Sequence, residues 1–223
     1  MNEILDTEYE TEPLFWPKDT DRLISEGYDV GLKQYVVQGW RIFMTDIGSF
    51  LIYATIFLAI NLFLEMIPVF GQIVAPILMF PLSMGFFVFA AKKMKNQPTR
   101  FQDFLKGFDY FVPLVIVGIL TSVLIVLGLF VFIIPGIYLA VAYLFSSMLV
   151  VDRKMTPWQA METSRKIITK NWLQIFGLAI IVLGITVAGT LIFIIGVIPA
   201  TAISLCILTA AYDDIIGIRS TDF

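Results

Sequence analysis

The sequence contains no histidine and only one cysteine. Histidine is the side chain that most often serves as a general acid or base near neutral pH, and it is the commonest metal ligand. The sequence also lacks a CxxC pair, a GxSxG elbow, a P-loop and a GxGxxG turn. These absences disfavour an enzyme, and we predict no catalytic residue, no cofactor and no metal site.

The single cysteine, Cys206, falls inside the last long apolar run, where no second cysteine can pair with it. A free cysteine in such surroundings packs as a small hydrophobic residue. The cysteine content therefore gives no information about the redox compartment.

Charge is also scarce, because charged residues make up 15% of the chain and hydrophobic residues 58%, with a mean hydropathy of +0.87. A soluble domain is usually about 25% charged and about 45–50% apolar. No long Ser-, Gly- or Pro-rich linker separates the apolar stretches, which leaves no room for an ordinary soluble domain. The composition predicts an integral membrane protein with one membrane domain.

The N-terminus lacks the basic start and apolar core of a secretory signal. Residues 1–29 hold nine acidic residues against two basic ones, so we expect a retained acidic arm in the cytosol. The membrane domain then spans residues 30–215, and residues 216–223 form a short cytosolic tail. As a hypothesis, the arm docks on the basic loops of the membrane domain and competes there with lipid headgroups; a tail that docks on nothing is the alternative.

Six apolar runs are long enough to cross a bilayer core, which needs about 17–25 helical residues. They are too long for buried strands. The chain is therefore expected to be all-α, a polytopic membrane protein with six transmembrane helices. The runs are Ile47–Ile67, Ile73–Ala91, Val112–Phe132, Pro135–Val151, Trp172–Ile195 and Val197–Tyr212.

Proline and glycine interrupt the apolar stretches at three places and predict tight turns there, so that the runs pair into three hairpins. The candidate turn residues are Pro68, Gly71, Pro135, Gly136 and Pro199. None of the 15 lysines and arginines falls in these turns. Basic residues favour the cytoplasmic side, so we predict a multi-pass protein of the cell's inner membrane with both termini in the cytoplasm.

An internal repeat is suggested by aromatic markers before each odd-numbered run, at Gly39-Trp40, Gly107-Phe108 and Asn171-Trp172. Each marker ends a short polar segment that reads as an amphipathic surface helix. The predicted unit is a cytosolic amphipathic helix followed by a hairpin, repeated over about 30–95, 96–155 and 156–215. Alternating long and short loops in any six-span protein would give a similar pattern by chance.

Two of the surface helices have clear signatures. In the second, Phe101, Phe104, Leu105, Phe108 and Phe111 recur on one helical face, and the polar residues Gln102, Asp103 and Lys106 take the other. The third begins at Thr156-Pro157-Trp158-Gln159, which combines an N-cap, a first-turn proline and a capping-box glutamine.

Such helices can lie at the membrane interface or pack across the cytosolic end of their own bundle. Both placements stay open. The expected partners of the protein are the lipid bilayer, through anionic lipid headgroups, and a protein partner or a second copy. Nothing in the sequence indicates nucleic acid. The candidate membrane-surface contacts are Lys92, Lys93, Lys95, Arg165, Lys166, Lys170, Trp40, Trp158 and Trp172.

The predicted spans carry no ionisable residue in their interior, where ion pathways usually place one. Asp46 and Asp109 stand at helix starts, where the helix dipole stabilises them. Asp152, Asp213 and Asp214 stand at helix ends, so Arg153, Lys154 or Arg165 are natural partners for them. A cation site formed by these three aspartates is the less favoured alternative.

Polar and small residues within the spans are expected to serve bundle packing, either by returning hydrogen bonds to the backbone or by letting helices approach at Gly118/Ser122 and Gly184/Ala188. The polar residues are Ser49, Asn61, Thr121, Ser122, Thr186, Thr190, Thr201 and Ser204. Pro76, Pro81 and Gly85 in the second span are expected to kink it and to open a cavity.

The most distinctive residues lie between about 130 and 176: Phe132-Ile133-Ile134-Pro135-Gly136-Ile137-Tyr138-Leu139, Val151-Asp152, Thr156-Pro157-Trp158-Gln159-Ala160, Ser164 and Asn171-Trp172. With them the chain resembles a bacterial and archaeal family of six-span membrane proteins of unknown function, related to the membrane domain of membrane-anchored glycerophosphodiester phosphodiesterases. The resemblance extends loosely over residues 30–215 and implies an all-helical inner-membrane domain. It implies no activity, because the chemistry of those enzymes resides in a separate soluble domain whose histidines have no counterpart in this sequence.

The leading hypothesis is a non-enzymatic membrane protein that contributes to envelope homeostasis or acts as a scaffold through its cytosolic face. The alternative is a transporter or flippase of a small amphipathic or lipid-like solute, based on the kinked second span and the repeat. A membrane enzyme using Asp152, Asp213 and Asp214 ranks third.

Overall fold

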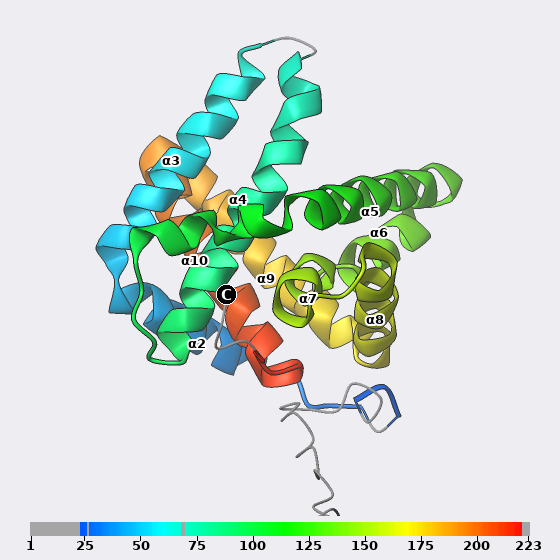
Figure 1. Cartoon of the computed structure of the whole chain (residues 1–223). Helices are drawn as coiled ribbons and strands as arrows, with labels where there is room; N and C mark the ends of the chain where they lie inside the picture. Colours follow the sequence, from blue (N-terminus) through cyan, green and yellow to red (C-terminus); the bar gives the residue numbers. More distant parts are fainter. Residues whose placement is uncertain (1–22, 26, 68–69, 220–223) are drawn as a thin grey trace, which may run out of the picture.

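Helices make up the regular structure of the described part of the chain, which comprises residues 23–25, 27–67 and 70–219 of a computed structural model (Figure 1). No strand occurs among these residues. In chain order the elements are α2 (Leu32–Thr45), α3 (Ile47–Glu65), α4 (Phe70–Met94), the 3-10 helix η1 (Phe101–Tyr110), α5 (Phe111–Val131), α6 (Ile133–Ala142), α7 (Ser146–Arg153), α8 (Pro157–Lys170), α9 (Trp172–Leu191) and α10 (Phe193–Ile215). The all-α prediction is confirmed.

Within the described residues, six helical segments are long and apolar enough to cross a membrane, which agrees with the number of predicted spans. They are Ile47–Glu65, Ile77–Met94, Phe101–Val131, Ile133–Arg153, Trp172–Leu191 and Gly196–Ile215. These segments indicate a multi-pass membrane protein.

The fourth predicted run, Pro135–Val151, is not one continuous helix. It divides into α6 and α7 at Tyr143–Phe145. There the backbone hydrogen bonds span three residues instead of four: the N–H of Leu144 donates to the carbonyl of Val141 and the N–H of Ser146 to that of Tyr143, both at 3.1 Å. Ser164 of α8 reaches into this break. Its hydroxyl donates to the carbonyl of Ala142 at 2.8 Å and accepts from the N–H of Phe145 at 3.3 Å. A side chain from a later helix thus hydrogen-bonds to backbone groups that have no helical partner at the break.

Two turns lie earlier in the chain than their prolines. The chain turns between α5 and α6 at Phe132, which is extended (φ −157°, ψ 147°), and Pro135 stands in the first turn of α6. Between α9 and α10 the break is at Ile192, and Pro199 lies inside α10. The first turn of a helix has no partner for its N–H groups, so a proline there costs no hydrogen bond.

Glycines at these turns allow close approach. A Cβ on Gly136 would meet the Leu129 side chain at 2.4 Å, and one on Gly71 would collide with the carbonyl of Leu64. Pro68, the remaining candidate turn residue, lies outside the described residues.

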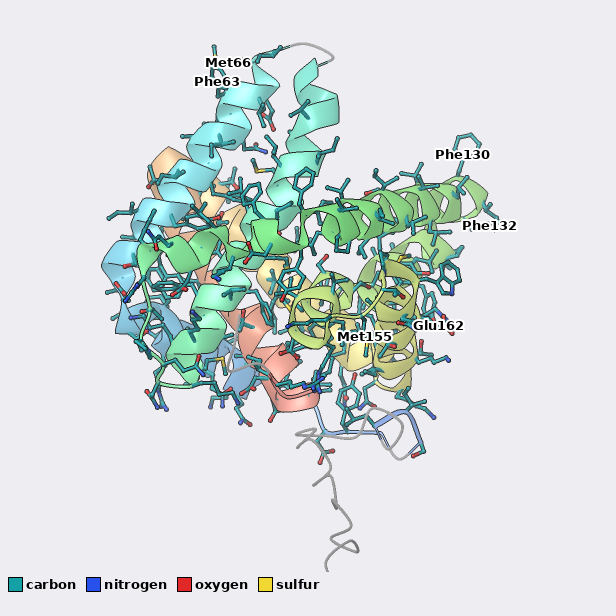
Figure 2. All side chains as sticks on the ribbon, in the orientation of Figure 1. Phe63, Met66, Phe130, Phe132, Met155 and Glu162 are labelled. Atoms are coloured by element: carbon teal, nitrogen blue, oxygen red, sulfur yellow. The ribbon has the colours of Figure 1, made fainter. Side chains whose placement is uncertain are left out.

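The long helices diverge in space (Figure 1). The tip where α3 meets α4 and the tip where α5 meets α6 point in different directions. Figure 2 shows Phe63 and Met66 at the first tip and Phe130 and Phe132 at the second. Met66 is 81% exposed and Phe130 92%. Such apolar tips suit the membrane–water interface at the end of a span, where part of their surface meets hydrocarbon at no hydrophobic cost.

The predicted amphipathic α-helix over residues 101–111 is a 3-10 helix instead, and its apolar residues do not share one buried face. Phe104 is buried and stacks between Tyr53 and Phe89, with ring centroids 4.1 and 4.0 Å apart. Leu105 is exposed, whereas Asp103, expected on the polar face, is buried. A 3-10 helix repeats every 3.0 residues, which changes the set of side chains that face inward.

The contact between α4 and η1 is made backbone to backbone through two glycines. A Cβ on Gly85 would collide with the carbonyl of Phe104, and one on Gly107 would collide with the carbonyl of Pro81. Tyr53 joins this crossing by donating its hydroxyl to the carbonyls of Leu82 at 3.0 Å and Phe104 at 3.1 Å. The approach of the two elements therefore depends on glycine at both positions.

The expectations for small and polar residues within the spans are met in part. Thr121, Thr186, Thr190 and Thr201 each donate to a backbone carbonyl four residues earlier. The Gly184/Ala188 pair, in contrast, lies on an exposed face of α9, with nothing within 4 Å of a Cβ on Gly184. This spacing therefore mediates no helix contact within the described part of the chain. Cys206 is buried, as expected.

Candidate functional site at the charged end

The polar side chains gather at one end of the long helices, where α3, α5 and α9 begin and α4, α7 and α10 end. We call this region the charged end. At its centre, α7 finishes with Asp152 and Arg153, which are only 3% and 6% exposed. The Arg153 Nε lies 3.0 Å from Asp152 Oδ2, and the same oxygen accepts from the Tyr212 hydroxyl at 2.8 Å. The predicted partnership of Asp152 with Arg153 is confirmed.

This buried pair holds the segment that follows α10. Arg153 Nη2 donates to the carbonyls of Ile216 at 3.1 Å and Gly217 at 2.9 Å, and Asp152 Oδ1 accepts from the N–H of Arg219 at 2.9 Å. Gly217 has a φ of +80°, a conformation that favours glycine. A charged pair is costly to bury unless hydrogen bonds satisfy it, and these backbone bonds supply that compensation. The pair therefore holds residues 216–219 against α7.

Asp213 and Asp214, the last acidic residues of α10, have separate partners. Asp213 Oδ1 accepts from the N–H of Ile218 at 2.9 Å and lies 3.2 Å from Lys95 Nζ. Asp214 Oδ2 accepts from the Tyr35 hydroxyl of α2 at 2.8 Å, and burial together with this bond raises the pKa of Tyr35. These bonds join α10 to the end of α4 and to α2.

The three aspartates at helix ends are not brought together as a cation site. Asp152 faces Arg153 and Tyr212, Asp213 faces Lys95, and the Asp214 carboxylate accepts from a tyrosine. Among the described residues, no group of three or more histidine, cysteine, aspartate or glutamate side chains is arranged to hold a metal ion.

Two lysines at the end of α4 are also paired. Lys92 Nζ lies 2.7 Å from Asp103 Oδ1. The other carboxylate oxygen of Asp103, Oδ2, accepts from the N–H of Arg100 at 2.7 Å. Lys93 Nζ lies 2.9 Å from Asp46 Oδ2, while Asp46 Oδ1 caps α3 through the N–H of Ser49 at 3.2 Å. Burial raises the pKa of Asp46, but the bonds from Lys93 and Ser49 outweigh it and leave the pKa below its ordinary value.

The helix α8 begins as predicted, with the N–H of Thr156 donating to Gln159 Oε1 at 3.4 Å. Ala160, Met161, Ser164, Ile167 and Ile168 form its buried face. This helix therefore packs on its own bundle, which was one of the two predicted placements.

On its outer side, Glu162 lies 2.8 Å from Arg165 and 3.5 Å from Lys166. The hydrogen bond from Arg165 is the main reason why the pKa of Glu162 is lowered. At the junction with α9, Asn171 donates to the carbonyl of Tyr28, and the Tyr28 hydroxyl donates to the carbonyl of Ile167 at 3.3 Å. The end of the predicted arm thus contacts the bundle, whereas residues 1–22 lie outside the described residues.

The candidate surface contacts separate into two groups. Lys92, Lys93, Lys95, Arg165 and Lys166 are held in ion pairs, and Trp172 donates to the carbonyl of Tyr138 at 3.3 Å. Trp40, Trp158 and Lys170 are exposed.

The helix α2 has apolar residues on two faces. Tyr35, Gly39, Ile42 and Phe43 are buried, and a Cβ on Gly39 would meet the Ile207 side chain of α10 at 2.5 Å. Val37, Trp40 and Met44 are about half exposed on the opposite side, and we call them the outer stripe of α2. Their spacing of three and four residues places them on one helical face.

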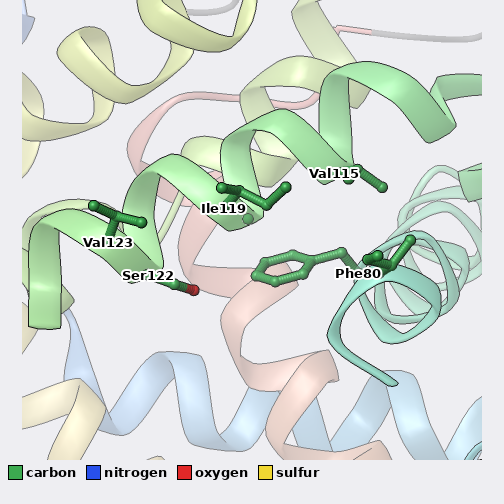
Figure 3. Close-up of a pocket in the computed structure, with 7 residues that line it drawn as sticks. Phe80, Val115, Ile119, Ser122 and Val123 are labelled. Carbon is green, nitrogen blue, oxygen red and sulfur yellow. The ribbon is translucent and has the colours of Figure 1, made fainter. Parts of the chain in front are cut away.

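A pocket of about 300 Å³ lies between α4 and α5, within two of the candidate spans. It is lined by Ile77, Phe80, Val115, Gly118, Ile119, Ser122 and Val123, and we call it the α4–α5 pocket. Figure 3 shows the ring of Phe80 reaching from α4 toward α5. Two sequence signals bear on this site: Pro76, Pro81 and Gly85 predicted a cavity at the second span, and the Gly118/Ser122 spacing predicted a close approach, which Gly118 makes to Phe80.

Comparisons of the chain with protein-family models, with curated proteins and with solved structures found no match.

Proposed function

We propose that this chain is a non-enzymatic integral membrane protein that acts as a scaffold, with its charged end on the cytoplasmic side of the inner membrane. The observation that carries this proposal is the buried Asp152–Arg153–Tyr212 cluster, which ties α7, α10 and the following segment together. A catalytic group has to reach its substrate, whereas these groups serve the packing of the protein. In this proposal the hydrogen bonds of the charged end hold the surface helices in fixed positions.

The surface that the charged end presents consists of the outer stripe of α2 and Trp158 of α8. Trp40 lies next to the exposed Arg41, and aromatic and basic residues together are typical of a membrane–water interface. In this proposal the surface meets anionic headgroups and a protein partner, and the three helix-and-hairpin units repeat the same arrangement around the molecule.

The scaffold proposal can be tested in membranes of the source cell by replacing Val37 or Met44 with a photoreactive amino acid. We expect one reproducible protein or lipid adduct at these positions, which Trp40→Ser should weaken. The matched control is Leu183→Ser, which replaces an exposed apolar residue of α9 far along the chain from the stripe. A partner found in this way must also bind the purified protein. Saturable solute flux in proteoliposomes would overturn the proposal.

The second candidate, a transporter or flippase of a lipid-like solute, is favoured by one observation. The α4–α5 pocket lies within candidate spans and is partly open. Flux of a fluorescent lipid between leaflets of proteoliposomes separates the two candidates. A scaffold gives the rate of protein-free vesicles, and a flippase gives a higher rate that falls when the pocket is filled.

A further inference from the structure

We propose that the α4–α5 pocket holds an acyl chain of a membrane phospholipid. The inference uses only the membrane-spanning character of α4 and α5, so it stands apart from the scaffold proposal.

The inner wall of the pocket is made by a close contact between an aromatic ring and a glycine. The Phe80 ring covers Gly118 so closely that a Cβ there would lie 2.5 Å from its Cε2 atom. Figure 3 shows Ile119, Ser122 and Val123 along α5 beside this ring. The side chain of Phe80 thus occupies the space that a larger residue at position 118 would take. The remaining space forms a slot between the two helices.

The lining of the slot disfavours water. Among the described lining residues, Ser122 is the one with a polar side chain, and a buried water usually needs two to four polar partners. Ile119, Ser122 and Val123 are also exposed on the outside of α5, so the slot opens on the face that a candidate span presents to lipid. The medium at this face is hydrocarbon, which fits the apolar lining.

Measured along α5, the depth of the pocket matches one leaflet. Val115 and Val123 lie four and twelve residues after the start of α5 at Phe111. At about 1.5 Å per residue, the pocket extends from roughly 6 to 18 Å along the helix. Half of a bilayer core is about 15 Å thick. Acyl chains of the leaflet at the charged end therefore reach the pocket.

An exposed apolar track leads to it from the charged end. Val112, Ile116, Ile119 and Val123 are at least two-fifths exposed and recur every three or four residues along α5. Lys106 stands shortly before this track, and its Nζ lies 3.6 Å from Asp109 Oδ2, with both side chains exposed. Such a pair contributes little to stability, so a lipid phosphate can compete for the lysine. Headgroup and chain of one phospholipid can thus be placed along a single helix.

The experiment uses the full-length protein in nanodiscs that contain a phospholipid with a photoreactive diazirine in the middle of one acyl chain. After illumination, proteolysis and mass spectrometry locate the adducts. We expect them to concentrate on Phe80 and on residues 115–123. Ser122→Trp fills the slot and should remove most of this adduct, and Val123→Phe is a milder second variant. The matched control is Val126→Trp, which adds the same bulk to an exposed position outside the lining.

Three outcomes would overturn the proposal. The first is an even spread of adducts over lipid-facing residues of α5 and α9. The second is labelling by a free fatty-acid probe but not by the phospholipid. The third is a protein–protein crosslink through the pocket, which would show that a second copy fills it. Thermal unfolding of each variant identifies those that fail to fold, and adduct mapping of wild type decides the matter without them.

Discussion

The hydroxyl of Tyr212 donates to Asp152 Oδ2 at 2.8 Å, although the two residues are 60 positions apart in the chain. Asp152 also accepts from the N–H of Arg219 and lies beside Arg153. One buried carboxylate therefore connects the end of α7, the last turns of α10 and the segment that follows. Loss of any of these bonds leaves charge in the interior with less compensation.

We expect Tyr212→Phe to lower the free energy of unfolding by about 1–3 kcal/mol, because the buried carboxylate loses a donor that water cannot replace. The matched control is Tyr138→Phe, which removes an exposed hydroxyl whose oxygen lies 2.7 Å from Thr169 Oγ1 and should cost less. Thermal unfolding of both variants in the same detergent measures the difference. Equal losses would show that the buried position of the Tyr212 bond has no special weight.

A second prediction concerns the glycine crossing of α4 and η1. Gly85→Ala places a methyl group on the carbonyl of Phe104 and should destabilise the protein by about 1–3 kcal/mol or more. The control is Gly184→Ala in α9, where a Cβ has open space and the helix gains about 0.5–1 kcal/mol from the better propensity of alanine. The two variants should therefore shift the unfolding temperature in opposite directions. A neutral Gly85→Ala would mean that the two elements are not in contact.

The spans could be predicted from the sequence because hydropathy acts over a window of about 20 residues and tolerates local irregularity. The break within the fourth span could not be predicted in this way. The segment Tyr143–Phe145 contains neither glycine nor proline, and the break is satisfied by Ser164 from another helix. The break therefore depends on a tertiary contact, which a window along the sequence does not register.

The charged end shows the same limit. Adjacency in sequence was enough to pair Asp152 with Arg153, but Tyr212 joins them only because α7 packs against α10. Lys95 and Asp213 are likewise separated by more than 100 residues. Asp103 was placed on a polar face under an α-helical period, and the 3-10 geometry turns it inward to Lys92. Contacts between residues far apart in the chain, and a change from the α-helical to the 3-10 period, cannot be predicted from a pattern that assumes a single helical period.

The third prediction concerns the Asp46–Lys93 pair at the start of α3. The pKa of Asp46 is lowered in the folded protein, so the folded state binds fewer protons than the unfolded state in the acid range. The stabilisation that ionised Asp46 gives the folded protein is therefore present at neutral pH, and it is lost as the pH falls below the usual aspartate pKa of about 3.9.

Asp46→Asn keeps a cap acceptor for Ser49 but removes the charge, whereas Asp46→Ala loses the cap as well, at a further cost of about 1 kcal/mol. The difference in unfolding temperature between wild type and Asp46→Asn should shrink as the pH falls through this window. If the difference is the same at pH 3 and pH 7, Lys93 contributes nothing through the charge of Asp46.

The last prediction concerns the sidedness expected for the six candidate spans, which is based on the absence of lysine and arginine at the tips. Cys206 is buried, and Cys206→Ala provides a background for single cysteines at exposed positions. We expect Met66→Cys, Phe130→Cys and Leu191→Cys, one at each tip, to react with a membrane-impermeant maleimide added to intact spheroplasts. Lys170→Cys should react only in inside-out vesicles. If any one of the second to fifth spans did not cross, two tips would lie on opposite sides, because a missing crossing reverses everything after it. Agreement among the three tips is therefore a stricter test of the topology than any one position alone.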